Sequence, residues 1–300
     1  MQNDKINLSL IIPIGLMLFS FFFGAGNLIF PPVLGQMAGE NISWGMLGFC
    51  LSGVGFPLLG VLTMAMKQSD NPDSIAMPMH PLYARAVTIL CALAIGPLFA
   101  IPRTAAVSFD TGIHSLLPAS CEAIGLPVYT VFFFVLTYFF SINPSKIIGH
   151  IGKFLSPMLL ICLAVLVVCV FVNPTGSLKM PNPDFAASPF FRGFQEGYNT
   201  MDLLAAILFG SITIKAIEAQ GITDKKVLTK LCSYAGLIAA FFLAIIYAAL
   251  AYTGALSINV FGVIPNGATL LSKICTYYMG FGGQVVLALI IFFASPPASA

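Results

Sequence analysis

Two short segments carry residues that could bind an anion and a cation inside a very apolar chain. The first, Gly24-Ala25-Gly26-Asn27, interrupts the apolar run of residues 7–30. Glycine lacks the Cβ atom that favours a regular helix, and an asparagine in hydrocarbon is costly without a partner. If the helix unwinds here, the Ala25 and Gly26 amides can face an anion, and freed carbonyls with the Asn27 oxygen can bind a cation. The alternative is a small-residue face for close helix packing.

The second segment is Gly197-Tyr198-Asn199-Thr200-Met201-Asp202, which precedes the apolar run of residues 203–214. It comes five helices after the first segment, at the corresponding position of an inverted repeat of five plus five helices. A matched pair of interrupted apolar segments is the best indication in a sequence of a transporter site. The alternative is that residues 190–202 form an outer loop, and that a helix begins at Asp202 as its cap or first-turn residue.

A third polar feature is Arg103 with Asp110, seven positions apart in an apolar stretch. Two turns of a regular helix would place both on one face. Charges at membrane depth usually pair or face water, so the two residues could shape a gate. A purely structural ion pair, or a helix extension outside the membrane, is an equally good interpretation.

Composition sets the kind of scaffold that must position these residues. Of the 300 residues, 58% are hydrophobic and 8% are charged, and the mean hydropathy is +0.96. Soluble domains carry roughly 25% charged residues, so the sequence predicts an all-α integral membrane protein. A net charge of +2 gives no reason to expect a nucleic-acid partner. No H-E-x-x-H, G-x-S-x-G or Walker A pattern occurs, so an embedded enzyme has the least support and an ion gradient must drive any transport.

Apolar stretches predict about eight transmembrane helices in a single domain without a soluble part. They cover residues 7–30, 42–66, 83–117, 126–142, 153–173, 190–217, 231–256 and 281–294. Nine lysines and arginines fall on the side of the N-terminus and three on the other, which predicts a cytoplasmic N-terminus. Of the outer connections, residues 174–189 contain too many prolines for one helix, and residues 268–278 could lie as a short amphipathic helix on the surface.

Three motifs carry a family resemblance. They are Phe23-Gly24-Ala25-Gly26-Asn27-Leu28-Ile29-Phe30-Pro31-Pro32, Gly96-Pro97-Leu98-Phe99-Ala100-Ile101-Pro102-Arg103-Thr104-Ala105 and Gly197-Tyr198-Asn199-Thr200-Met201-Asp202. Over residues 8–294 the chain resembles the bacterial branched-chain amino acid carriers, the BrnQ-type symporters. The resemblance implies sodium-coupled uptake of leucine, isoleucine and valine across the bacterial inner membrane. It also implies a LeuT-like inverted-repeat fold, with a first repeat over residues 7–173 and a partial second over 190–294.

The resemblance also assigns roles within the two interrupted segments. The amides at Ala25 and Gly26 would hold the substrate carboxylate. Sodium, the coupling ion and the only small ion or cofactor implied, would bind near the carbonyls of Ser20 and Phe23 and the side chain of Asn27. The substrate's amino group and side chain would lie against the second segment, whose candidate residues are Tyr198, Asn199, Thr200 and Asp202.

The last six residues, 295–300, depart from the family pattern. Ser295-Pro296-Pro297 stands where the family continues with a hydroxyl-bearing stretch that should complete a sodium site, and two prolines are expected to end the helix. The hypothesis is a product truncated by a frameshift or a damaged gene, with an aberrant tail and an incomplete second repeat. The alternative to a symporter is therefore a non-transporting remnant of such a carrier.

Overall fold

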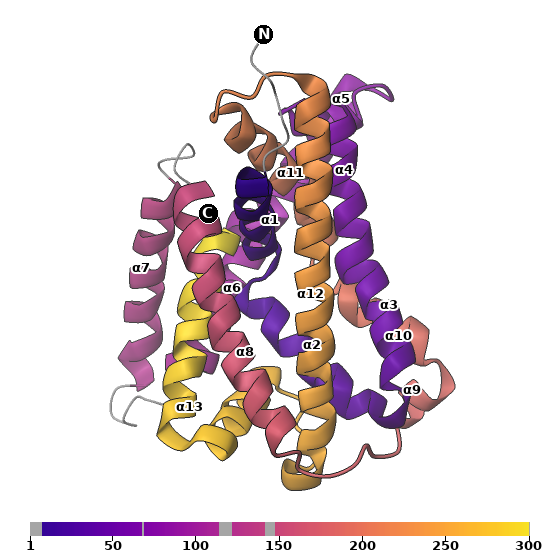
Figure 1. The fold of residues 1–300 in the computed structure, drawn as a ribbon, viewed down its shortest axis with the longest axis vertical. Coiled ribbons are helices and arrows are strands. Elements are labelled where there is room, and N and C mark those ends of the chain that lie inside the picture. The colour runs from indigo at the N-terminus through magenta and orange to yellow at the C-terminus, as the bar shows by residue number, and fades with distance from the viewer. Residues whose placement is uncertain (1–7, 68, 114–121, 142–147, 300) are drawn as a thin grey trace.

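The computed structural model describes residues 8–67, 69–113, 122–141 and 148–299, and every regular element within these ranges is a helix (Figure 1). The predicted all-α architecture is confirmed. The α-helices are α1 (Leu8–Phe22), α2 (Ala25–Ala38), α3 (Ile42–Cys50), α4 (Phe56–Lys67), α5 (Pro81–Leu93), α6 (Ala100–Ser108), α7 (Glu122–Ser141), α8 (Ser156–Val172), α9 (Pro183–Ala187), α10 (Pro189–Tyr198), α11 (Asp202–Glu218), α12 (Lys225–Phe261) and α13 (Gly267–Ser299). The short 3₁₀ and π segments between them are η1 (Gly39–Asn41), η2 (Leu51–Gly55), η3 (Pro72–Ile75), η4 (Ala94–Leu98), η5 (Phe109–Ile113) and η9 (Ile148–Leu155).

The eight predicted spans are mainly helical in their described parts. Five helical stretches are long and apolar enough to cross a membrane, and the bent pair α10–α11 adds a sixth. Two shorter apolar helices, Leu10–Phe22 and Ile124–Phe139, lie in the first and fourth predicted spans. The first is short because the chain breaks after α1. Whether residues 7–173 and 190–294 are inverted repeats stays a prediction.

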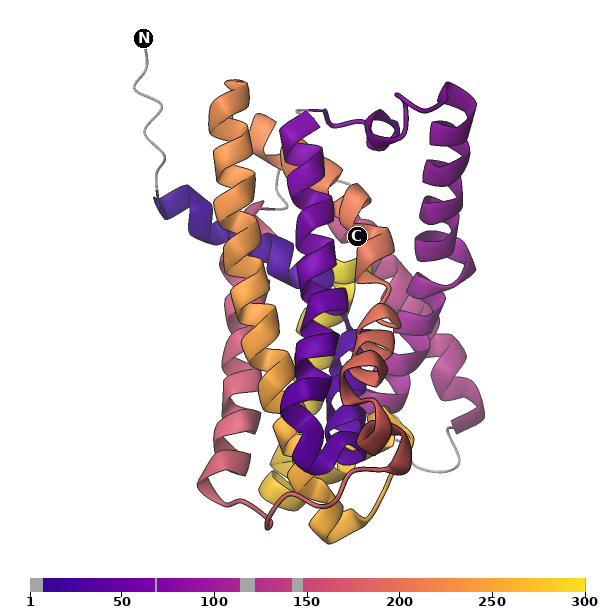
Figure 2. The same cartoon turned by 90° about the vertical axis from the view of Figure 1, so that its right-hand side faces the viewer.

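The ends of the helices divide into two sets. Figures 1 and 2 show the α4–α5 connection and the α11–α12 connection at the upper end of the molecule. The α8–α9 and α12–α13 connections lie at the lower end. This is the division expected from the lysines and arginines in the sequence.

Close helix contacts in the interior depend on glycine. A Cβ atom on Gly35 of α2 would overlap the backbone of Ala251 in α12, and one on Gly254 of α12 would overlap Pro32. Gly48 of α3 and Gly193 of α10 approach each other's helices in the same way. In a bilayer, where apolar burial gives little driving force between helices, such contacts let dispersion forces hold the bundle together.

The outer surface of the bundle is apolar. In the most apolar 18-residue stretch of Pro81–Gly112, which contains α5 and α6, only 6% of the residues are buried. Large side chains such as Leu90, Phe132 and Val168 are exposed on α5, α7 and α8. Exposed residues of this kind fit a hydrocarbon environment, in which helices satisfy their own backbone hydrogen bonds.

Proline and glycine positions bend the later spans in ways that the sequence predicts only in part. The expected kink in the third span occurs at Gly96, whose ψ of −114° is not helical. The expected surface helix forms the first part of α13, before a break at Gly280 with φ of 58°. The expected helix end at Pro296-Pro297 is wrong, because α13 continues to Ser299. A proline deletes one backbone hydrogen bond and strains one turn, and a helix can accommodate this as α2 does at Pro31 and Pro32.

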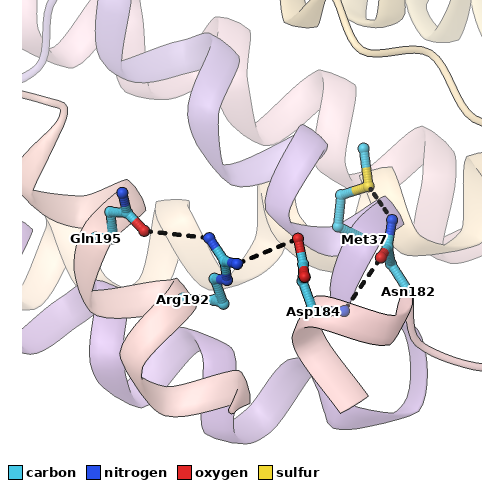
Figure 3. Close-up of polar contacts among 5 residues, drawn as sticks. All are labelled: Met37, Asn182, Asp184, Arg192 and Gln195. Carbon is cyan, nitrogen blue, oxygen red and sulfur yellow. Dashed lines mark hydrogen bonds and ion pairs between the residues drawn. The ribbon is translucent and has the colours of Figure 1, made fainter. Parts of the chain in front are cut away.

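Polar contacts attach the α8–α10 connection to the lower end of α2 (Figure 3). The Asp184 carboxylate lies 3.3 Å from the Arg192 guanidinium, which joins α9 to α10. Asn182 caps α9 by accepting from the Asp184 backbone N–H, and its own Nδ2 lies 3.6 Å from Met37 Sδ. The Asn182 N–H also donates to the Met37 carbonyl at 2.8 Å. These contacts hold α10 beside α2, so that the second interrupted segment is fixed relative to the first.

Candidate functional site

The first span is broken in the middle of the bundle, as predicted. α1 ends at Phe22, Gly24 is extended with φ of −94° and ψ of 172°, and α2 begins at Ala25. The first amides of a helix have no intrahelical acceptor, and neither do the last carbonyls. Two opposite helix ends therefore meet at this break, with positive α2 amides and negative α1 carbonyls side by side.

The second segment is interrupted as well, and the residues before it form a helix rather than a loop. α10 is helical up to Tyr198, and α11 begins at Asp202 at an angle of 46°. Met201 between them has a φ of 66°, a left-handed conformation that is uncommon outside glycine. Backbone strain of this kind concentrates at functional positions. Asp202 becomes the acidic first-turn residue of α11, where the helix dipole favours its charge.

One hydrogen bond joins the two breaks directly. Asn27 Nδ2 donates to Asp202 Oδ2 at 2.7 Å across 175 positions of sequence, and both side chains are buried. Among the described residues, no cationic side chain forms an ion pair with Asp202. A buried carboxylate without a cation is unfavourable, so the site calls for a positive charge or a proton beside Asp202.

Tyr247 of α12 completes this polar cluster, and the sequence did not reveal it. Its Oη lies 2.8 Å from Asn27 Nδ2, which also lies 2.7 Å from the Phe22 carbonyl at the end of α1. The ring is fully buried, stacked on Phe23 and edge-on to Phe49. One indication was present in the sequence: a tyrosine lies within the apolar run that forms α12. A buried tyrosine hydroxyl usually forms a hydrogen bond, so this residue could have been expected to meet a polar partner.

A cavity of about 60 Å³ lies between the two breaks and the third span. Gly26, Asn27, Thr200 and Asp202 supply its polar wall. The apolar wall comes from α1, η4 and α11, through Phe21, Phe22, Ile95, Ala205 and Phe209. The arrangement offers helix-end amides, a carboxylate and aromatic rings around one small space.

Gly26 faces this cavity rather than a neighbouring helix. A Cβ atom added to Gly26 would meet no heavy atom within 4 Å, whereas one on Gly35 would strike backbone. The small-residue packing alternative therefore does not hold at Gly26. Its missing side chain leaves the first turn of α2 open to whatever occupies the cavity.

Several predicted site residues lie outside the cavity wall. Ala25 is buried without lining the space, and Tyr198, on the last turn of α10, is 51% exposed. Asn199 has an exposed side chain and contributes only its carbonyl, which accepts from Arg103 Nη1 at 3.4 Å. Of the second segment, Thr200, Met201 and Asp202 line the cavity.

The predicted pairing of Arg103 with Asp110 is wrong as an ion pair within the described ranges. The Arg103 guanidinium lies 4.9 Å from the Phe30 ring centre and 5.9 Å from that of Phe99, and it lines the cavity. Asp110 is exposed on η5. The α-helix passes into a π-helical turn at Phe109, which breaks the regular two-turn spacing assumed for the pair.

The predicted sodium residues lie at the end of α1, beside the cavity. Ser20 is fully buried, and its Oγ is 2.7 Å from Ser156 Oγ at the start of α8. Ser156 Oγ in turn lies 2.8 Å from the Leu16 carbonyl, so the pair fastens α1 to the fifth span. The Gly24 N–H donates to the Phe22 carbonyl rather than to that of Ser20, which lies four positions earlier. The Ser20 carbonyl is thereby left without this helical partner, whereas the Phe22 carbonyl accepts from the Gly24 N–H and lies 2.7 Å from Asn27 Nδ2.

Comparison with known proteins identifies the family. The profile described as "Branched-chain amino acid transport protein" matches residues 7–297. The chain belongs to this family. The matched range extends into residues 295–297, which the sequence had assigned to an aberrant tail. Together with its apolar helices, family membership makes the chain a multi-pass membrane protein of a transporter family and not an enzyme.

Curated relatives cover nearly the whole chain. It is 44% identical over 290 residues to "Branched-chain amino acid permease BrnQ" of Bacillus subtilis (strain 168), covering 97% of this chain and 66% of the relative. It is 38% identical to the permease BrnQ of Escherichia coli (strain K12), covering 95% and 64%. It is 37% identical to "Branched-chain amino acid transport system 3 carrier protein" of Pseudomonas aeruginosa. That match covers 95% of this chain and 64% of the relative. The chain thus spans a little under two thirds of the length of these relatives.

Gly26→Val is expected to block the cavity of this family member without unfolding it. The valine methyl groups would enter open space, so the free energy of unfolding should change by no more than about 0.5 kcal/mol. Any ligand of this cavity should bind at least about tenfold more weakly, because the added methyl groups would fill part of the space. Thermal unfolding and equilibrium binding of labelled leucine measure the two effects. Unchanged affinity would show that the cavity is not the binding site.

Tyr247→Phe tests the cluster from α12. The ring contacts persist while one hydrogen bond to Asn27 is lost, so stability should fall by about 0.5–1.5 kcal/mol. Leucine affinity should fall in parallel, because Asn27 then loses one of the contacts that orient it toward Asp202. Tyr252→Phe, on the same helix and stacked on Phe171, is the matched control and should leave affinity unchanged. Equal affinities for the two variants would remove Tyr247 from the site.

Proposed function

We propose that this chain forms the substrate-binding core of a sodium-coupled symporter for leucine, isoleucine and valine. The observation that carries the proposal is the Asn27–Asp202 hydrogen bond, which joins two helix breaks beside a cavity. Membership of the branched-chain amino acid transport family supports the substrate class.

The cavity has complementary groups for each part of such a substrate. The N–H groups of the first turn of α2, at Ala25 and Gly26, hold the carboxylate at the positive end of that helix. Asp202 receives the ammonium group, which supplies its missing positive charge. The aliphatic side chain lies against Phe21, Phe22 and Phe209. A cavity of about 60 Å³ holds a few water molecules, so the wall must move to admit leucine. Arg103, which lines this wall, serves as the gate in this proposal.

Sodium binds at the negative end of α1 in this proposal. The carbonyls of Ser20 and Phe23 and the side-chain oxygen of Asn27 are hard ligands, which suit sodium. The location beside the substrate site supports coupling, because one ion then stabilises the same broken helix that binds the carboxylate. We also propose a cytoplasmic N-terminus, which the distribution of lysines and arginines in the sequence supports, and a location in the bacterial inner membrane.

Uptake of labelled leucine into liposomes that contain only this chain tests the function. Accumulation driven by an inward sodium gradient, insensitive to a protonophore, is expected. Accumulation driven by a proton gradient without sodium would contradict sodium coupling. Leucine binding without any accumulation would identify the chain as a non-transporting form of the carrier. Absence of both binding and uptake would overturn the proposal.

A further inference from the structure

One face of α6 forms part of the wall of the central cavity. Ala100, Arg103 and Thr104 all line the space, and residues three and four positions apart lie on one face of a helix. The face of α6 that carries Arg103 is therefore turned toward the two helix breaks. Among the described residues that line this cavity, Arg103 is the only cationic side chain and Asp202 the only anionic one.

The contacts of Arg103 hold its guanidinium in place but use few of its hydrogen-bond donors. The guanidinium carbon lies 4.9 Å from the Phe30 ring centre, and Nη1 donates to the Asn199 carbonyl at 3.4 Å, which is longer than a typical N–H···O hydrogen bond. A guanidinium carries five N–H donors, and the others find no acceptor among the described residues. Arg103 is half-buried, so donors without an acceptor are unfavourable, and the side chain can bind an anion from the cavity.

Two charges of opposite sign thus line one cavity without neutralising each other. Neither Arg103 nor Asp202 forms an ion pair within the described ranges. The hydrogen bond from Asn27 orients the Asp202 carboxylate but brings no positive charge to it. An α-amino acid carries an ammonium and a carboxylate on one carbon atom, so a single molecule in this cavity can supply the missing partner of both residues. A simple amine or a simple carboxylate would leave one of the two charges unpaired.

We propose that Arg103 binds the carboxylate of the amino acid substrate and selects ligands that carry an α-carboxylate. This assignment rests on the proposed function and deepens it. A planar guanidinium forms two parallel hydrogen bonds with a carboxylate, which adds geometric specificity to its charge. Phe30 lies one turn after Gly26 on α2, so Arg103 already contacts the helix whose first turn receives the same carboxylate. Because the substrate carboxylate attracts Arg103, the gate closes over an amino acid and not over an amine.

Equilibrium dialysis of labelled leucine and of labelled 3-methylbutylamine, which is leucine without its carboxylate, tests the assignment. Arg103→Gln should lower leucine affinity by about 10- to 150-fold, because hydrogen bonds between charged groups are lost, and should change amine affinity by less than about twofold. Arg103→Lys keeps the charge without the paired donors, so its leucine affinity should lie between those of Arg103→Gln and the unaltered chain. Arg192→Gln removes an arginine whose partner is Asp184 of α9, and as the matched control it should leave both affinities unchanged.

A third ligand separates a carboxylate-binding arginine from a structural one. 4-Methylpentanoate, which keeps the carboxylate and lacks the ammonium group, should lose affinity for Arg103→Gln as leucine does. Equal losses for leucine and 3-methylbutylamine, or unchanged binding of 4-methylpentanoate, would overturn the role of Arg103. Leucine binding that Asp202→Asn weakens and Arg103→Gln does not would defeat this assignment alone. Absence of all leucine binding to the unaltered chain would defeat the proposed function and the assignment together.

Discussion

Asp202→Asn is expected to lower leucine affinity by about 10- to 150-fold. The asparagine oxygen can still accept from Asn27 Nδ2, but the negative charge opposite the substrate ammonium is gone. Hydrogen bonds to charged groups contribute about 1.5–3 kcal/mol, which sets this range. Equilibrium binding of labelled leucine to the purified chain in lipid nanodiscs measures it. Glu218→Gln, at the other end of α11 and exposed, is the matched control.

The same substitution should raise the thermal stability of the ligand-free chain. Asp202 is buried without a cationic partner in the described part of the structure, so neutralising it removes an unfavourable buried charge. A residue with only a structural role would behave in the opposite way, with lower stability and little change in affinity. A loss of leucine affinity together with a gain in thermal stability therefore distinguishes a ligand-binding carboxylate from a structural one.

Gly35→Ala is expected to cause a large loss of stability. The new methyl group would overlap the Ala251 backbone of α12, and two long helices must move apart to admit it. Overpacking of this kind costs about 1–3 kcal/mol, and in this case the helix that moves also carries Tyr247. The midpoint of thermal unfolding in detergent measures the loss.

Gly282→Ala is the control for this prediction. A Cβ atom at Gly282 would meet nothing within 4 Å, so the midpoint should remain unchanged. If both variants unfold at the same temperature, close packing of α2 on α12 does not hold the bundle together. Leucine should partly rescue Gly35→Ala, because a ligand that binds the folded state stabilises it by mass action.

The sequence predicted those features that depend on local chemistry in hydrocarbon. Glycines and a polar side chain in an apolar run indicated the break before Asn27, and the start of α11 at Asp202 is the one that the outer-loop alternative expected from helix capping. Tyr198, which the resemblance assigned to the site, lies outside the cavity wall, because its direction depends on how the last turn of α10 packs. Likewise, no local rule indicates that Tyr247 reaches Asn27, since the contact depends on the rotation of α12 about its axis.

Regular helix spacing was the least reliable assumption. The Arg103–Asp110 pair required two unbroken α-helical turns, and the π-helical segment η5 interrupts them. The end predicted at Pro296-Pro297 required proline to stop a helix, yet α13 continues past both residues.

Binding of leucine and of 4-methylpentanoate, which lacks the ammonium group, to the unaltered chain and to Asp202→Asn tests the central claim most directly. The account predicts that the substitution weakens leucine binding by at least about tenfold and leaves 4-methylpentanoate binding unchanged, because only the ammonium group contacts Asp202. Equal losses for the two ligands, or no loss for either, would contradict the assignment of the two helix breaks as the binding site for a branched-chain amino acid.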